Sequence, residues 1–564
     1  MGNEKNGSTM DPKPADRILL IFAVLLSLGI AYKLSYPVIV STIWFVRLHP
    51  SGISFLLKSM LFFGFIITLG TLWNKFITWR EVKHITLSDD GSVYLGKDTE
   101  TKEEVHLKAD FRTMHTQLIG TTNAGKTASV IMPWIAQDIE KGRGMLIVDG
   151  KSDRSFLDKL YAYAAQHGRK NDVMVFSLTN PNISSTFNPL AQGTPEQITE
   201  RIFSTFEFTE EYYKNAQYEA LRTVLTLLVK RGQIPTPGVV RELLRDKKKL
   251  LGWTEGLTDT NLLRDVLKMT ELKDEEFDKK FSGLVTALGH FSQGETAALF
   301  NAKYPDIVLS EVLKSRKICY FQLPTMQLGI LGSTTGKLLL QSLTSAISEL
   351  QGAGTGKLKE LFPIFLDDFN DYIYPGFVSL LNKSRSANIG VVFSHQSLGD
   401  LEKVGPDFRQ GVMTNTNVKI IMRSNDPDSA ETFASSIGTK DTEKTTERRK
   451  KGMFRDENTG EQSVRNVEEF RIHPNIFKGK LGRGEGIVVL PHQSGTMVKR
   501  VKFETVPDLP VIQMPIRDLP LMDFGEQATY YGAKRDELKA PPRGKNKKPS
   551  RPKGKNESEN EKGT

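Results

Sequence analysis

The residues best suited to chemistry lie in one short segment, Gly120 to Thr127, with the letters GTTNAGKT. They match the phosphate-binding pattern G-x-x-x-x-G-K-[ST]. The two glycines let the backbone turn tightly enough for successive N–H groups to surround phosphate oxygens. Lys126 would reach the β- and γ-phosphates, and the Thr127 hydroxyl would ligate Mg²⁺. The predicted contacts to ATP are Gly120, Thr121, Thr122, Asn123, Ala124, Gly125, Lys126, Thr127 and Ala128.

This segment needs a strand before it and a helix after it. A short, largely apolar stretch at 115–120 leads into it, and a helical pattern follows to about Glu140. The amino end of that helix would add its positive dipole end to the phosphate site. Two similar segments, 332–337 and 354–357, lack the full loop between the glycines, so we interpret them as ordinary turns or helix starts.

A phosphate-binding loop of this kind also needs a carboxylate at the end of a buried parallel strand. The segment 145–149 ends in Asp149, and the segment 362–368 ends in Asp367 and Asp368. The second fits better because it ends in paired carboxylates. Asp367 would hold Mg²⁺ through water, and Asp368 would orient or deprotonate the attacking water.

A further strand-like segment, 389–396, ends in Gln396. Ligands of parallel sheets bind at the carboxyl edge of the strands. We therefore predict that Gln396 touches the γ-phosphate, although a polar residue at this position is often only exposed to solvent.

Six segments occur in order along the chain. They are GTTNAGKT (120–127), VDGKSD (148–153), FNPL (187–190), FLDD (365–368), SRSANIGVVFSHQ (384–396) and NTNVKIIMR (415–423). In order and spacing, over about residues 17–500, they resemble the type IV coupling proteins, the TraG/TraD group of the FtsK/HerA-like ATPases. The resemblance implies a homohexameric ATPase that brings DNA, with its attached relaxase and relaxosome proteins, to the channel proteins of a type IV secretion system.

The resemblance also implies roles for single residues. Lys126 and Thr127 would contact the nucleotide and Mg²⁺, Asp367 would be the Walker B acid, and Gln396 would sense the γ-phosphate. Arg385 resembles the arginine that one subunit supplies to its neighbour's site. Such an arginine contributes about 10³ to 10⁵ in rate, so hydrolysis would depend on assembly of the ring.

The chain departs from the family pattern in three places. Asp368 stands where the family usually has Glu, and it is one methylene shorter. Asn123 and Ala124 replace a more usual Gly/Ser pair, which the backbone cradle should tolerate. Arg423 is the rival to Arg385 as the transferred arginine.

Two apolar runs near the amino terminus predict a membrane anchor, with spans at about 17–36 and 57–78. Because the number of spans is even and the ATP-using part is inside, the amino terminus is also expected in the cytoplasm. The resemblance makes this the bacterial inner (cytoplasmic) membrane. A cleaved signal peptide is the alternative for the first run, but no A-x-A-like cleavage site follows it.

The fold class predicted for the chain is α/β. We expect a RecA-like P-loop ATPase domain with an inserted all-helical domain, preceded by two N-terminal transmembrane helices. The predicted divisions are 1–80 (cytoplasmic N-terminus and anchor), 81–193 (first part of the nucleotide-binding domain), 194–310 (inserted helices), 311–530 (second part of the nucleotide-binding domain) and 531–564 (disordered basic tail). Within the second part, the charge-dense stretch 440–470 is predicted as an exposed loop or hairpin.

Composition limits the function classes. The chain has 564 residues, one cysteine (Cys319) and a net charge of +10. A disulfide scaffold is therefore excluded. Seven basic residues without an acid fall in 541–556, so the body is only mildly basic. In the ring we expect largely non-specific binding of single- or double-stranded DNA by lysines and arginines of the lumen.

Two other functions stay open at this point. One is an FtsK-like chromosome DNA translocase, which should carry more spans and a C-terminal winged-helix module. The other is a non-hydrolysing membrane receptor for secreted protein cargo. The sequence has no His/Cys cluster with zinc spacing, so we expect no nuclease chemistry.

Overall fold

The computed structural model describes residues 91–206, 210–352, 356–451, 456–492 and 495–517, together with six single positions before residue 69. Contacts divide the chain into two units, Met1–Ser88 and Asp89–Thr564, and the candidate site lies in the second. The predicted spans fall almost entirely outside the described residues, and the predicted tail falls wholly outside them. Within the described part of the chain, no helix combines the length and apolarity needed to cross a bilayer.

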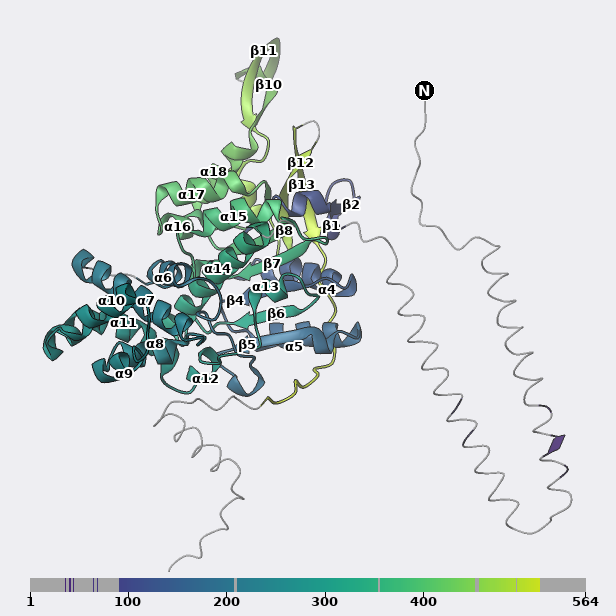
Figure 1. Cartoon of the computed structure of the whole chain (residues 1–564). Helices are drawn as coiled ribbons and strands as arrows, with labels where there is room; N and C mark the ends of the chain where they lie inside the picture. Colours follow the sequence, from purple (N-terminus) through teal and green to yellow (C-terminus); the bar gives the residue numbers. More distant parts are fainter. Residues whose placement is uncertain are drawn as a thin grey trace, which may run out of the picture. The chain divides into compact units, whose positions relative to one another are not determined.

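An eleven-stranded sheet forms the centre of the unit from residue 89 onward (Figure 1). Its order is β2-β1-β13-β12-β9-β3-β8-β7-β4-β6-β5. The strands are β1 (Val93–Asp98), β2 (Glu104–Leu107), β3 (Thr116–Ile119), β4 (Met145–Asp149), β5 (Val173–Ser177), β6 (Ile318–Gln322), β7 (Phe362–Asp367), β8 (Ile389–His395), β9 (Val418–Met422), β12 (Glu485–His492) and β13 (Gly495–Phe503). From β9 to β5 all neighbours pair in parallel, whereas β12, β13, β1 and β2 extend the sheet by antiparallel pairs.

The parallel strands are apolar on both faces, as strands covered by helices on both sides must be. β4 shows the arrangement: Met145 and Ile147 join one buried cluster, and Leu146 and Val148 join the other. The first cluster continues into α4 and α5, and the second into α14, α15 and the helices of 195–300. The helices outside that segment are α3 (Ala109–Arg112), α4 (Met132–Glu140), α5 (Arg154–Gln166), α14 (Gly329–Gly352), α15 (Phe377–Ser386), α16 (Leu398–Glu402), α17 (Pro406–Asn415) and α18 (Pro427–Ile437).

The chain between β5 and β6 is helical. It contains α6 (Pro195–Phe203), α7 (Glu211–Lys230), α8 (Pro237–Leu243), α9 (Lys247–Gly252), α10 (Thr260–Thr270), α11 (Asp274–Ser292), α12 (Ala297–Phe300) and α13 (Leu309–Val312). α6 begins behind Thr194. The Thr194 side chain accepts from the Gln197 N–H, and the Gln197 side chain accepts from the Thr194 N–H, which satisfies two helix-end donors.

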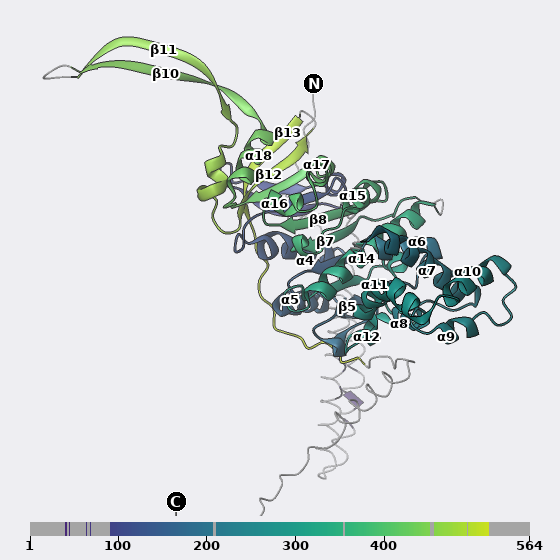
Figure 2. The same cartoon turned by 90° about the vertical axis from the view of Figure 1, so that its left-hand side faces the viewer.

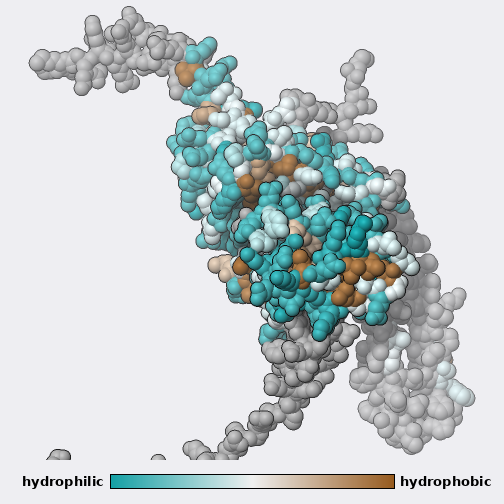
Figure 3. Space-filling view, turned by 60° about the vertical axis from the view of Figure 1, so that its left-hand side comes forward, coloured by the Kyte–Doolittle hydropathy of each residue, from teal (hydrophilic) through white to brown (hydrophobic). Residues whose placement is uncertain are grey.

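The segment 440–470 forms a hairpin, one of the two forms predicted for it. β10 (Thr439–Lys451) pairs antiparallel with β11 (Asp456–Phe470), with a register shift between Glu447 and Arg449. In Figure 2 this hairpin projects from one end of the unit, and α7 to α11 gather at the other end. The face seen in Figure 3 is mostly hydrophilic, with separate small hydrophobic patches.

Candidate nucleotide site

The loop after β3 turns as a phosphate-binding loop must. Asn123 (φ 66°) and Gly125 (φ 101°) both adopt positive φ, which asparagine tolerates and glycine favours. The chain then enters a π-helical turn, η2 (Lys126–Ile131), which continues into α4. The loop backbone is held from outside, because the Thr121 N–H donates to the Arg423 carbonyl at 2.9 Å.

Lys126 is buried and points back to its own loop. Its Nζ donates to the carbonyl of Gly120 at 2.6 Å and to that of Thr121 at 3.4 Å. Burial lowers the pKa of Lys126, and the charges of Asp368 and Asp367 oppose this. A triphosphate in the loop would offer this ammonium group stronger acceptors than the two carbonyls.

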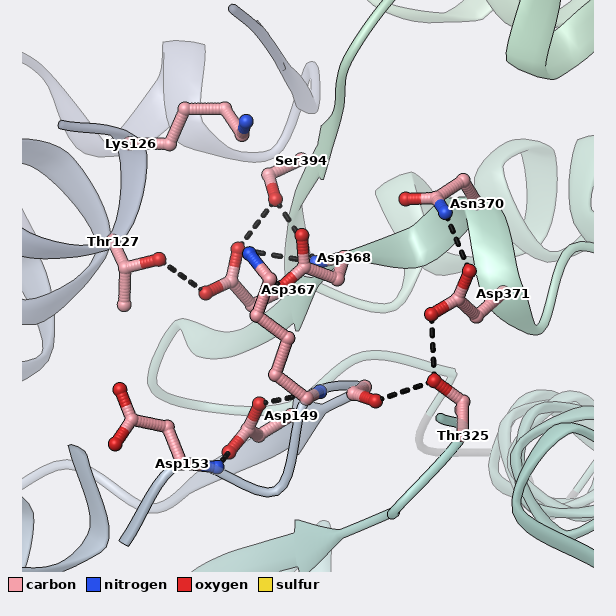
Figure 4. Close-up of polar contacts among 12 residues, drawn as sticks. Lys126, Thr127, Asp149, Asp153, Thr325, Asp367, Asp368, Asn370, Asp371 and Ser394 are labelled. Carbon is pink, nitrogen blue, oxygen red and sulfur yellow. Dashed lines mark hydrogen bonds and ion pairs between the residues drawn. The ribbon is translucent and has the colours of Figure 1, made fainter. Parts of the chain in front are cut away.

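Thr127 and Asp367 meet across the site (Figure 4). Thr127 Oγ1 donates to Asp367 Oδ2 at 2.5 Å, which joins the start of η2 to the end of β7. Ser394, on β8, donates to the other oxygen, Asp367 Oδ1, at 2.5 Å. Since β8 lies between β3 and β7, its serine orients the carboxylate from the intervening strand.

Asp368 follows directly and is held by two contacts. Its backbone is left-handed (φ 47°), and its N–H donates to Ser394 Oγ at 3.1 Å. Its Oδ2 lies 2.8 Å from the ammonium group of Lys151, while the carboxyl is only 3% exposed. Burial and the charge of Asp367 raise the pKa of Asp368, and Lys151 and Lys126 oppose the rise.

Asp149 lies on the neighbouring strand, in register with Asp367. Its carboxylate accepts from the backbone N–H groups of Lys151 at 2.9 Å and Asp153 at 2.6 Å. The Tyr320 hydroxyl donates to it at 2.7 Å. Burial raises the pKa of Asp149 to about 6, against these hydrogen bonds. Asp149 therefore anchors the loop that carries Lys151, whereas Asp367 contacts the phosphate-binding loop.

Gln396 and Arg423 lie at the same edge of the sheet as Lys126. Gln396 is exposed directly after β8, and its backbone N–H donates to Asp400 at 3.0 Å. Arg423 is exposed directly after β9 and contacts the loop through its carbonyl.

Arg385 lies at the opposite edge of the sheet. It is exposed near the end of α15, shortly before β8 begins. The seven residues of β8 span about 20 Å. Within one chain, Arg385 and the site at Lys126 are therefore not brought together.

Residues 362–472 match the family model described as the TraM recognition site of TraD and TraG. The chain is also 22% identical, over 409 residues, to the type 4 coupling protein DotL of Legionella pneumophila. That alignment covers 60% of this chain and 50% of DotL, so the chain spans about half the length of this relative.

Both matches support the predicted resemblance to the type IV coupling proteins. Solved structures add a likeness of fold. The bacterial conjugative coupling protein TrwBdeltaN70 matches with a TM-score of 0.54 and 15% identity, over 73% of this chain and 88% of that chain. TrwB in complex with ADP and Mg²⁺ matches with a TM-score of 0.51 and 15% identity, over 72% and 88%. These likenesses confirm the predicted α/β P-loop ATPase fold.

Two residues of this candidate site have no predicted role from sequence. Lys151 lies in the segment VDGKSD, which contributed to the family resemblance, and Ser394 lies in a predicted strand. The signal for Ser394 is a polar residue near the end of an otherwise apolar strand. The order of the strands, which places Ser394 against Asp367, cannot be predicted from the local sequence.

The residues present fit ATP with Mg²⁺. Mg²⁺ binds hydroxyl and carboxylate oxygens and usually has only a few protein ligands. Thr127 Oγ1 and Asp367 Oδ2 already lie in contact. Thr121 Oγ1 is buried in the loop without a hydrogen-bond partner, so a phosphate oxygen there would satisfy it. The described residues form no cluster of three or more His, Cys, Asp or Glu able to hold a metal, so phosphate and water would supply the other ligands.

Proposed function

We propose that this coupling protein hydrolyses ATP with Mg²⁺ to drive or license the passage of a DNA–relaxase substrate into a type IV secretion channel. The observation that carries the proposal is the 2.5 Å contact between Thr127 and Asp367, which brings together a hydroxyl and a carboxylate of the kinds that ligate Mg²⁺, beside the phosphate-binding loop. The nucleotide complexes of TrwB, with ADP and Mg²⁺ and with a non-hydrolysable ATP analogue, support the same use of the fold.

In this proposal, different residues bind the phosphates, accept the proton of the attacking water and contact the γ-phosphate. Backbone N–H groups of the loop and Lys126 bind the β- and γ-phosphates. Mg²⁺, when bound, neutralises charge that develops on the phosphate oxygens. Asp368 accepts the proton of the attacking water, and Lys151 holds this carboxylate in place at 2.8 Å. Gln396, exposed at the same edge, contacts the γ-phosphate and the water.

Assembly into a homohexamer is part of the proposal. Arg385 is exposed and lies about 20 Å, the length of β8, from the carboxyl edge of its own sheet. A neighbouring subunit in a ring is the natural acceptor of such an arginine. Hydrolysis would then be tied to ring assembly.

Membrane anchoring and cargo also belong to the proposal. Spans at 17–36 and 57–78 would place the ATPase domain on the cytoplasmic side of the bacterial inner membrane. Lysines and arginines of the ring lumen would bind DNA with little sequence preference, so affinity would fall steeply with salt. The description of the matched family model, a TraM recognition site, supports relaxosome proteins as partners.

A second candidate is a non-hydrolysing receptor for secreted protein cargo. The observation in its favour is the short carboxylate of Asp368, which is engaged by Lys151 and stands where the family usually has glutamate. In that case nucleotide would bind and stabilise the ring without being cleaved.

The deciding experiment measures ATP hydrolysis by the full-length protein in lipid nanodiscs, with and without single-stranded DNA. Lys126→Ala should abolish Mg²⁺-dependent hydrolysis, while Lys357→Ala, in the shorter glycine-rich segment, should leave it unchanged because Lys357 is exposed. Assembled rings that bind ATP but release no phosphate under any of these conditions would establish the receptor instead.

A further inference from the structure

Among the described residues, four arginines are almost completely buried, and three of the four have a carboxylate partner. Arg112 and Arg143 both pair with Asp138, at 2.6 and 2.7 Å. Arg169 pairs with Asp172, three residues later, at 3.1 Å. Where this fold buries a guanidinium for structural reasons, it therefore supplies an acid. The fourth arginine, Arg201 on α6, is only 3% exposed and has no ion-pair partner among the described residues.

The guanidinium of Arg201 has unused donors. Nη1 donates to the carbonyl of Pro189 at 2.5 Å, but Nε has no hydrogen-bond partner. Burial lowers the pKa of Arg201 to about 10, so the group stays charged at neutral pH. A buried cation without a counter-charge is strongly unfavourable. An anion that enters from solvent would remove this cost.

A cavity of about 570 Å³ lies against this arginine. α6, α14 and the loop that precedes α6 supply most of its walls. Its size falls within the range of small-molecule sites. Ser342, on α14, also lines the cavity, and its Oγ is buried without a hydrogen-bond partner. Two residues from different helices, each with an unpartnered buried polar atom, thus line one space.

The lining distinguishes between kinds of anion. Arg201 is its only basic residue, and its one acid, Glu349, is exposed. The remaining lining residues are apolar or uncharged. One guanidinium matches the charge and the planar, bidentate geometry of a carboxylate, whereas a dianionic phosphate would keep an unmatched charge. The apolar part of the wall suits an organic body attached to that carboxylate.

We propose that the cavity between α6 and α14 binds a carboxylate-bearing ligand, with Arg201 as the cationic anchor and Ser342 as a second donor. The carboxylate belongs either to a free organic acid or to the end of a short peptide. The site is distinct from the candidate nucleotide site, since none of its lining residues belongs to the loop at Lys126 or to the strand ends around Asp367.

The test is isothermal titration of the full-length protein at fixed ionic strength. The probes are hexanoate, its neutral isostere hexanamide, inorganic phosphate, and the tripeptide Gly-Gly-Leu with a free or an amidated carboxyl terminus. We expect hexanoate or the free peptide to bind and both amides to fail. The tighter of the two carboxylates identifies the source as an organic acid or a peptide end.

Variants assign the binding to this cavity. Arg201→Gln should weaken carboxylate binding at least about tenfold, and Ser342→Ala should weaken it less. Arg222→Gln, which alters an exposed arginine on α7, should change nothing. If Arg201→Gln does not fold, Ser342→Ala and the amide probes decide. Unchanged affinity in Arg201→Gln, binding of phosphate alone, or no binding of any probe would overturn the proposal.

Discussion

The ammonium group of Lys151 lies 2.8 Å from Oδ2 of Asp368. This ion pair joins the loop after β4 to the end of β7, two strands that are neighbours in the sheet. Asp149 fixes the same loop by accepting two backbone N–H groups, and the Tyr320 hydroxyl donates to Asp149. The proposed base is therefore positioned by a chain of contacts that reaches β6.

Lys151→Met should lower kcat for ATP hydrolysis roughly tenfold to a hundredfold, because the base loses the group that aligns it. KM for ATP should change little, since Lys151 is not part of the phosphate-binding loop. Lys151→Arg should restore part of the rate. Steady-state kinetics on the assembled protein measure both constants. Lys159→Met, which breaks an exposed ion pair with Asp508, is the matched control. A rise in kcat for Lys151→Met would show instead that the pair restrains the base.

Thr127→Ala should weaken the binding of ATP roughly tenfold when Mg²⁺ is present and leave it nearly unchanged in EDTA. The reason is that the hydroxyl is expected to be a ligand of the metal rather than of the phosphates. Titration with a fluorescent ATP analogue measures both affinities. Thr258→Ala changes an exposed threonine outside the phosphate-binding loop and should have no effect. Equal losses with and without Mg²⁺ would contradict the assignment.

A mixture of two inactive variants tests the arginine. Lys126→Ala and Arg385→Ala should each lack hydrolysis alone, but a one-to-one mixture should regain roughly a quarter of the wild-type rate. That fraction is the chance that an intact Lys126 faces an intact Arg385 in a randomly mixed head-to-tail ring. A mixture of Lys126→Ala with Arg423→Ala should regain nothing if Arg423 acts within its own chain. An inactive Arg385 mixture would contradict the supply of Arg385 by the neighbouring subunit.

His115 should make the fold sensitive to acid. Its Nε2–H donates to the Leu381 carbonyl at 2.8 Å, and its Nδ1 accepts from the Val391 N–H at 3.1 Å, so the ring is neutral. Burial lowers the pKa of His115 to about 4 from an unfolded value of 6.5. Because the pKa is lower in the folded protein, the unfolded chain binds the proton more strongly. The stability from neutral His115 is therefore fully present above about pH 6.5 and is lost as the pH falls toward 4.

The free energy of unfolding should therefore fall by about 2 kcal/mol between pH 7 and pH 5 on account of His115. Urea denaturation at both values, in wild type and in His115→Gln, measures the difference. The variant is less stable at pH 7, but its loss on acidification should be smaller by this amount. An identical pH dependence in both proteins would show that His115 does not titrate in this range.

Local sequence was sufficient for the parts of the site that lie on one element. The phosphate-binding loop, the paired aspartates at the end of β7 and Gln396 after β8 each follow from a pattern within a few residues. Asp149 and Asp367 were rivals in the sequence, and the register of β4 with β7 places them side by side with different partners.

Contacts that depend on strand order were beyond local patterns. Ser394 reaches Asp367 only because β8 pairs between β3 and β7. Lys151 reaches Asp368 only because β4 lies next to β7. Arg201 gave no signal at all, since an arginine on an amphipathic helix is ordinarily solvated. Its burial without an acid is a property of how α6 packs against the rest of the fold.

The phosphate-binding loop is closed by a distant part of the chain. The Gly484 N–H donates to the Ala124 carbonyl at 3.0 Å, and the Gly484 carbonyl accepts from the Phe503 N–H at 2.9 Å. During translation, the ribosome must therefore add several hundred residues after the loop before these partners exist, which takes roughly half a minute at 5–20 residues per second. A nascent chain stays without its completed loop until β13 has emerged, so premature termination anywhere upstream of residue 484 yields a polypeptide that lacks this closure.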